Sequence, residues 1–183
     1  MSNFAADHNR LFSNLEHALD NDMATIAVQA NGGRSILFCY PHEEDNEYIA
    51  EGKQRLSADL YEFADVREIF SAFVQEIGES KFERLHSRHG KGIFFSEDFS
   101  EGTFFHYLMN KLGHIISCGK SPVLIHTGAI FDMGFSNINI MESSLILNSN
   151  KPLIVFYPCS IEGETIKFLG IQVASRYRCI VVK

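Results

Sequence analysis

Polar side chains of the kinds used in catalysis follow several apolar runs of this 183-residue chain. His126 follows the apolar run 123–125, and Cys159 follows a second run that ends in Tyr157 and Pro158. A thiol and an imidazole are the nucleophile and the base of cysteine-dependent acyl transfer when a fold brings them together. Nothing in the spacing shows that these two side chains meet, so an incidental pairing is the simpler interpretation.

A ligand site at the same strand ends is a second interpretation of these residues. Ligands of α/β proteins bind beyond the carboxyl ends of the strands, and the glycine-containing loop 126–134, "HTGAIFDMG", follows a strand-like run. Tyrosine and histidine also stand at the end of the first apolar run. The candidate ligand-binding residues are Tyr40, His42, His126, Thr127, Asp132, Tyr157 and Cys159. No residue is assigned a catalytic role.

The familiar cofactor motifs are incomplete in this chain. The stretch "CGKSP" contains the Gly-Lys-Ser that ends a P-loop, but His114 stands where the first glycine is required. A helical pattern precedes the stretch and a strand follows it, the reverse of the order that turns backbone amides toward phosphates. The histidines at 86, 89, 106 and 114 lack the partner ligands of a specific metal motif. The sequence therefore predicts neither a metal nor a nucleotide cofactor.

The elements that must position these residues alternate between helical and strand-like patterns. Apolar residues recur at helical spacing in 3–20, 45–56, 65–77, 101–118 and 137–148, although the isoleucines of the last segment also allow a strand. Asp65 is the N-cap and Gly78 the terminator of the third helix. Segment 81–100 is expected to hold a short helix and a loop. Strands are predicted at 36–40, 59–64, 121–128 and 151–158, and two more in the tail 165–183, joined by a turn at 174–176.

Two of the predicted strands end in the same dipeptide, Tyr-Pro, followed by carboxylates. Pro41 and Pro158 are expected to end their strands, because proline cannot donate to the ladder and restricts the residue before it. The acidic residues after Pro41 then start a helix, where the dipole favours them, and those after Pro158 fill a turn. This doubled feature needs no active site to explain it.

Alternation of strands and helices implies right-handed crossovers and a parallel sheet. The near-continuous apolar runs are typical of strands that are covered on both faces. The prediction is a single domain, 1–183, with a three-layer α/β/α sandwich, a mostly parallel sheet and an antiparallel C-terminal edge.

Composition narrows the classes of function. The net charge is -7 and the pI is near 5.6, which argues against nucleic-acid binding, since that needs clustered basic residues. The most basic stretch, 81–91, is typical of a solvated helix face. None of the four cysteines forms a C-x-x-C pair, and the first residues lack a signal-peptide core. The expectation is a cytoplasmic protein with reduced thiols and without a membrane span.

Several segments resemble, in order, the BrxB family. They are "FCYPHEED" at 38–45, "DLYEFADVREIF" at 59–70, "TGAIF" at 127–131, "PLIVFYP" at 152–158, "EGE" at 162–164, "FLG" at 168–170 and "YR" at 177–178. BrxB proteins are encoded in bacteriophage exclusion (BREX) loci of bacteria and archaea, beside genes for a methyltransferase, a PglZ-type protein and a large ATPase. The resemblance implies a small α/β defence component that works through partners, and it implies no catalytic residues.

The chain departs from the family pattern after its Gly-Ala turn. The family usually has a proline there, followed by Arg-x-His, whereas Asp132 takes the place of the proline and "NINIMESS" contains neither arginine nor histidine. The leading hypothesis is a non-enzymatic interaction component of an antiphage system that acts through a PglZ-like or other protein partner. The alternative is an enzyme or small-ligand sensor whose site at the strand ends uses His126, Asp132, Tyr157 and Cys159.

Overall fold

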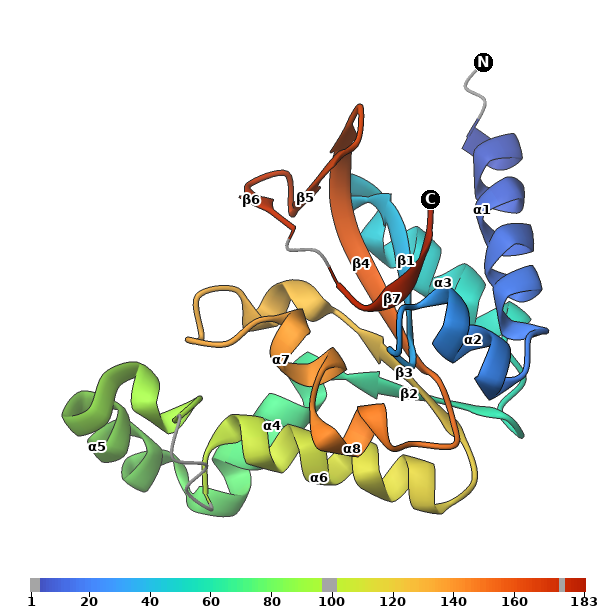
Figure 1. Cartoon of the computed structure of the whole chain (residues 1–183). Helices are drawn as coiled ribbons and strands as arrows, with labels where there is room; N and C mark the ends of the chain where they lie inside the picture. The colour runs from blue at the N-terminus through green and yellow to red at the C-terminus, as the bar shows by residue number, and fades with distance from the viewer. Residues whose placement is uncertain (1–3, 97–101, 175–176) are drawn as a thin grey trace.

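Five parallel strands form the centre of the molecule, and Figure 1 shows them running side by side. The computed structural model describes residues 4–96, 102–174 and 177–183. Within these residues the parallel strands follow the order β2-β3-β4-β1-β7. Their bounds are β1 (Ser35–Pro41), β2 (Tyr61–Asp65), β3 (Ser121–Ile125), β4 (Leu153–Glu162) and β7 (Cys179–Val182).

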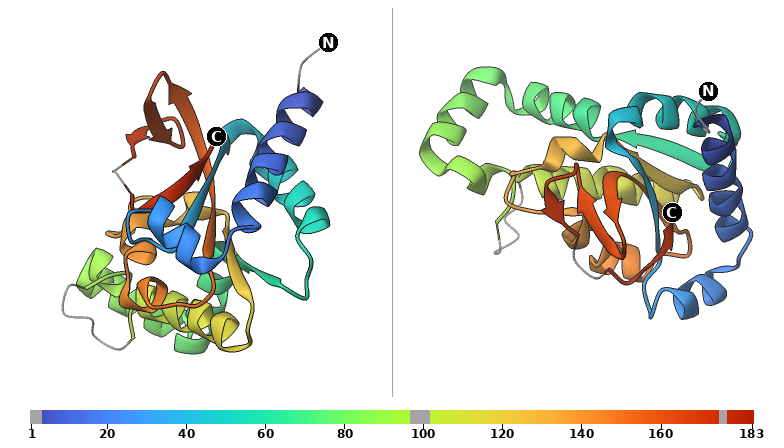
Figure 2. Two further views of the ribbon diagram at one scale, coloured as in Figure 1. Left: turned by 45° about the vertical axis from the view of Figure 1, so that its right-hand side comes forward. Right: turned by 90° about the horizontal axis from the view of Figure 1, so that it is seen from above.

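Helices cover both faces of this sheet (Figures 1 and 2). One face is covered by α1 (Phe4–Leu19), α2 (Met23–Gln29) and α3 (Asp45–Arg55), and the other by α4 (Val66–Ile77), α6 (Phe104–Ser117), α7 (Asn137–Met141) and α8 (Ser144–Leu147). The helix α5 (Glu79–His89) has no buried residue and projects from the second layer. Short 3-10 turns, η1 (His42–Glu44), η2 (Gly90–Ile93) and η3 (Thr127–Ile130), connect the elements.

Successive side chains of a strand point to opposite faces of the sheet, so each central strand contributes to the apolar core on both faces. In β1, Ile36, Phe38 and Tyr40 pack against α1–α3, while Leu37 and Cys39 pack against the layer on the other face. All five side chains are buried, as expected for a parallel strand between two layers of helices. The predicted three-layer α/β sandwich with a mostly parallel sheet and antiparallel strands at its C-terminal edge is confirmed.

The strand β4 does not end at its proline, so the prediction for Pro158 was wrong. It pairs in parallel with β1 as far as Cys159 and then continues to Glu162, antiparallel to β5 (Thr165–Phe168). The Pro158 carbonyl accepts the N–H of Leu169 at 2.9 Å, on the edge of β4 where β3 has ended and β5 begins. The missing N–H faces this junction of two partner strands, where a proline interrupts no continuous ladder.

The tail also differs in detail from the prediction. β5 and the two-residue β6 (Gln172–Val173) form the antiparallel extension, whereas β7 returns to the sheet and lies parallel to β1. The predicted turn at 174–176 falls partly outside the described residues. Helix 137–148 is divided into α7 and α8, and α2 was not predicted, although Asp22 caps it by accepting the Thr25 N–H at 2.7 Å.

Candidate functional site

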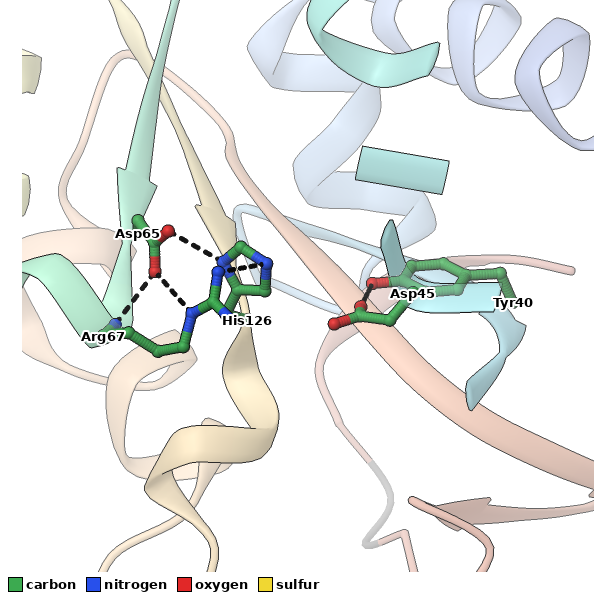
Figure 3. A network of polar contacts seen from close by, with 5 residues as sticks. All are labelled: Tyr40, Asp45, Asp65, Arg67 and His126. Atoms are coloured by element: carbon green, nitrogen blue, oxygen red, sulfur yellow. Dashed lines mark hydrogen bonds and ion pairs between the residues drawn. The ribbon is translucent and has the colours of Figure 1, made fainter. Parts of the chain in front are cut away.

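The carboxyl ends of β2 and β3 carry a compact polar network, which Figure 3 shows in close-up. His126 Nδ1 lies 2.8 Å from Asp65 Oδ2, and Arg67 Nη2 lies 2.7 Å from His126 Nε2. The other carboxylate oxygen, Asp65 Oδ1, accepts the backbone N–H of Arg67 at 2.9 Å and thereby caps α4. Asp65 and His126 are each 9% exposed, so the network is largely shielded from water.

The network fixes the hydrogen-bonding state of the imidazole. A guanidinium has only donors, so His126 Nε2 must accept from Arg67 and Nδ1 must carry the proton that is donated to Asp65. His126 also has a left-handed backbone with φ 53°, which is uncommon for a residue other than glycine. Both ring nitrogens are therefore occupied, and the left-handed turn sends the chain away from β3 into η3.

The charge on Asp65 is favoured by its surroundings. Burial opposes ionisation, but the Arg67 N–H together with the Arg67 and His126 side chains outweighs it, so the pKa of Asp65 lies below its usual value. The carboxylate is thus a fixed negative charge between a cap and an imidazole. An arrangement of this kind orients His126, and it holds the partly exposed guanidinium of Arg67 at the edge of the sheet.

Tyr40 and His42 lie at the end of β1 and have separate surroundings. The Tyr40 hydroxyl donates to Asp45 Oδ1 at 2.6 Å, and burial together with this carboxylate raises the pKa of Tyr40 well above its usual value. His42 packs on Gly170, where an added Cβ would come within 3.1 Å of its ring. The turn η1, which leads into α3, also contains Glu43 and Glu44. Their negative charges oppose the binding of a phosphate at the start of this helix.

Thr127 and Asp132 both belong to the loop after β3, but their side chains have different contacts. The Thr127 hydroxyl is buried and donates to the carbonyl oxygen of Phe156 at 2.8 Å, which ties the loop to β4. Asp132 is exposed and forms an ion pair with Lys91. Thr127 therefore has a structural role that is visible in the fold, whereas Asp132 lies at the surface.

Tyr157 and Cys159 point into the layer of α4, α6, α7 and α8. The Tyr157 hydroxyl lies 3.0 Å from that of Tyr177. Cys159 hydrogen-bonds to the thiol of Cys39 on the neighbouring strand, and this contact together with burial raises the pKa of Cys39 far above its usual value. Cys39 therefore remains protonated, whereas the same contact lowers the pKa of Cys159.

The seven predicted site residues are therefore brought to one edge of the sheet but not into one pocket. Asp132 and Tyr157 line a small pocket of about 40 Å³, whereas Tyr40 and Cys159 line a larger cleft of about 490 Å³. The hypothetical pair of Cys159 and His126 is not formed, because the two nitrogens of His126 are bonded to other residues.

Asp65 and Arg67 are the polar partners that sequence reasoning missed. The N-cap role of Asp65 was predicted correctly, but its bond to His126 was not. A signal was present, because the chain has a carboxylate at the end of one predicted strand and an imidazole at the end of the next. Only the pairing of β2 with β3, with Asp65 opposite Ile125, makes the two side chains neighbours.

Comparison of the chain with protein-family models, with curated proteins and with solved structures gave no match in any of the three. The resemblance to the BrxB family thus rests on the quoted residues. Among the residues that the structure describes, no group of three or more histidine, cysteine or acidic side chains is arranged to hold a metal ion. No helix in the same residues is long and apolar enough to cross a membrane.

Proposed function

We propose that this protein is a non-enzymatic interaction component of a bacterial or archaeal antiphage system of the BREX type. It acts in the cytoplasm through a PglZ-like or other protein partner. The observation that carries the proposal is an exposed apolar surface where the antiparallel extension meets the loop after β3. We call it the hairpin surface; its apolar members are Phe131, Ile171 and Val173.

The hairpin surface gathers three exposed apolar side chains. Ile171 is 68% exposed, Val173 is 61% exposed and Phe131 is 41% exposed. An open cleft of about 620 Å³ lies between Phe131 and Ile171. Clustered apolar side chains around a depression are typical of surfaces that bind another protein, whereas single exposed apolar residues are ordinary.

The backbone of the extension adds hydrogen-bonding capacity to this surface. In the described part of the chain, β6 pairs with β5 alone, so its other edge is available for strand pairing. Figure 1 shows β5 and β6 projecting from the sheet. A partner segment in extended conformation can pair with such an edge and place apolar side chains against Ile171 and Val173. The occupant that fits is therefore an extended, apolar segment of a partner protein.

Three of the segments that resemble the BrxB family lie beside the hairpin surface. Phe38–Asp45 holds the end of β1, Thr127–Phe131 holds the turn after β3, and Phe168–Gly170 ends β5. These segments come from distant parts of the chain and meet at the carboxyl edge of the sheet, beside the hairpin surface. A resemblance at this edge is what a shared docking role would produce.

Affinity capture with the products of neighbouring genes tests the proposal. The wild-type protein is expected to retain at least one of them, and a variant with Ile171→Glu and Val173→Glu is expected to lose it, because two charges would be buried at the interface. Val28→Glu is the matched control, since Val28 is 79% exposed on α2, away from the hairpin surface.

Two outcomes would contradict the proposal. One is that no neighbouring gene product is retained by the wild-type protein. The other is that the double variant retains its partner as well as the Val28→Glu control does. Light scattering of the purified protein separates self-association from partner binding, because a dimer lost in the double variant would assign the hairpin surface to a second copy of the chain.

A further inference from the structure

The cleft lined by Tyr40 and Cys159 lies where connections leave the sheet on opposite faces. After β1 the chain enters α3, in the layer formed by α1–α3, whereas after β3 it enters the layer of α7 and α8, from which β4 returns beside β1. Open α/β sheets bind ligands at such a point, beyond the carboxyl ends of the strands. The cleft of about 490 Å³ is lined by the ends of β1 and β4 and by α1. This volume is in the usual range for small-ligand sites.

The phenol of Tyr48 reaches this cleft from α3. Tyr48 is 1% exposed. Its ring stacks on Tyr40 with the centroids 4.7 Å apart, and the ring of His8 packs against it at a tilt with the centroids 3.8 Å apart. Yet its hydroxyl makes no hydrogen bond with any residue that the structure describes, although Tyr48 lines the cleft. The hydroxyl oxygen keeps some exposure at the cleft, so it is available to form a hydrogen bond with a ligand there.

The electrostatics around that hydroxyl are acidic. Burial, followed by the charges of Glu44 and Asp7, raises the pKa of Tyr48 to about 12. Glu43 also lines the cleft, and its carboxylate contacts His42 rather than a permanent cation. Carboxylates concentrated beside a partly enclosed volume attract cations and repel anions.

The basic residues of the cleft do not offset these carboxylates fully. The Arg10 guanidinium contacts Asp7 at 3.9 Å and the carbonyl oxygen of Lys183 at 3.4 Å, so it is held at one side. Lys183 is exposed at the rim. Glu44 has a histidine, His8, as its ion-pair partner at 3.6 Å, and this histidine is charged only when protonated. The carboxylates of the cleft therefore outnumber the cations that face them permanently.

The rest of the lining is apolar and suits an aliphatic stem. Leu11, Pro41 and Ile161 lie around the cleft together with the ring of Tyr40. Ile161 is 43% exposed, so an apolar ligand segment would cover it. We infer that this cleft binds an organic cation, namely a protonated amine or guanidinium on an aliphatic stem, with the cation at Glu44 and the Tyr48 hydroxyl. The cation comes either from a free amine or from a lysine or arginine side chain of a partner.

Isothermal titration of the full-length protein tests this inference. The probes are agmatine and 1,5-diaminopentane as free amines, and the capped tripeptides Ala-Lys-Ala and Ala-Arg-Ala as models of a partner side chain. The neutral and anionic controls are 1-pentanol and pentanoate. At least one cationic probe is expected to bind with Kd below about 1 mM, whereas the two controls are not. Preference for the amines or for the peptides identifies the source of the cation.

Two conservative variants locate the site. Glu44→Gln is expected to weaken binding at least about tenfold, since a charge-assisted hydrogen bond is lost, and Tyr48→Phe by roughly threefold to tenfold. Glu62→Gln is the matched control, because Glu62 is an exposed carboxylate on β2. Circular dichroism verifies that each variant is folded.

Three outcomes would overturn the inference: every cationic probe binds more weakly than the limit above, 1-pentanol binds as well as the amines, or both cleft variants bind like Glu62→Gln. The proposed partner interaction is tested through the hairpin surface, which has different residues. Failure of one test therefore does not affect the other proposal.

Discussion

A single carboxylate, Asp65, connects local helix formation with the tertiary arrangement of the sheet edge. Its Oδ1 caps α4 through the Arg67 N–H, and its Oδ2 accepts from His126, which follows the adjacent strand. A surface cap satisfies one backbone donor, whereas this cap also satisfies a buried imidazole. The side chain is only 10% exposed, so both bonds form in a region of low water content, where losing one partner is costly.

Asp65→Asn is expected to lower the free energy of unfolding at pH 7 by about 1–3 kcal/mol, because a charged acceptor of His126 is lost while the cap is kept. The pKa of Asp65 is lower in the folded protein than in the unfolded chain. Its stabilising contribution is therefore fully present above the unfolded value near 3.8 and is lost as the pH falls through the folded value. Urea unfolding of the wild type and of Asp65→Asn at pH 7 and at successively lower pH measures this loss, because the stabilities of the two proteins should become equal as the pH falls.

The Glu62→Gln variant serves again as the comparison for Asp65→Asn. Glu62 is 46% exposed in its side chain and lies 3.8 Å from Lys120, so its ion pair is screened by water. Its replacement is expected to change the free energy of unfolding by less than about 0.5 kcal/mol, both at pH 7 and at the lower pH values. A difference between wild type and Asp65→Asn that stays constant down to the lowest pH would contradict the role given to the Asp65 charge.

The residues of the candidate site were predictable by type but not by contact. His126 and Thr127 were placed at the end of a strand because apolar runs mark strands well. Their partners, Asp65 and the carbonyl oxygen of Phe156, depend on which strands are neighbours, and sequence patterns do not state strand order. Tyr48 was missed for a related reason: on a polar helix a tyrosine resembles part of the apolar stripe, and only the packing of α1 reveals its unpaired hydroxyl.

At the scale of elements, the first and last strands meet through one close backbone contact. A Cβ added to Gly33, just before β1, would lie 1.7 Å from the carbonyl oxygen of Arg178, just before β7. Two residues later Ser35 pairs with Cys179, which begins the ladder between these strands. The absence of a side chain at Gly33 therefore allows β7 to dock in its register.

Gly33→Ala is expected to destabilise the protein by about 3 kcal/mol or more, since the obstacle is a backbone atom that cannot rotate away. Gly32→Ala is the matched control: φ is 89° there, but an added Cβ would meet nothing within 4 Å. Its cost is limited to backbone strain of about 1–2 kcal/mol. Urea unfolding of both variants measures the difference, and equal stabilities would show that β7 can shift to admit the methyl group.

The elements themselves were largely predictable, and the failures have physical causes. Strongly periodic helices such as α4 and α6 were found with nearly correct ends, because their stripes and caps agree. β4 was predicted too short, since the local rule for proline does not foresee a change of partner strand at Pro158. The order of the parallel strands, and the return of β7 to β1 in particular, follows from packing over long sequence distances.

At the scale of the whole molecule, the last residues of the chain complete a core that the first residues begin. Val182 is 5% exposed and packs in the same cluster as Leu11, Phe12 and Leu15 of α1. β7 also covers one edge of β1, the strand between the two helix layers. Contacts between two segments so distant in the sequence are expected to form late in folding, because closing so long a loop costs entropy before any contact offsets it.

Removal of Cys179–Lys183 is expected to abolish cooperative unfolding rather than lower stability by a few kcal/mol. Without β7, the edge of β1 loses its hydrogen-bonding partner and the core beneath α1 opens to water, so the two layers no longer depend on each other. Urea unfolding monitored by circular dichroism would then show a broad transition with a smaller m-value, since less surface is buried. Val181→Ser is the control, because Val181 is 40% exposed on the same strand. A truncated chain that unfolds with the wild-type m-value would show instead that β7 is an accessory edge and that the other four parallel strands form the cooperative unit.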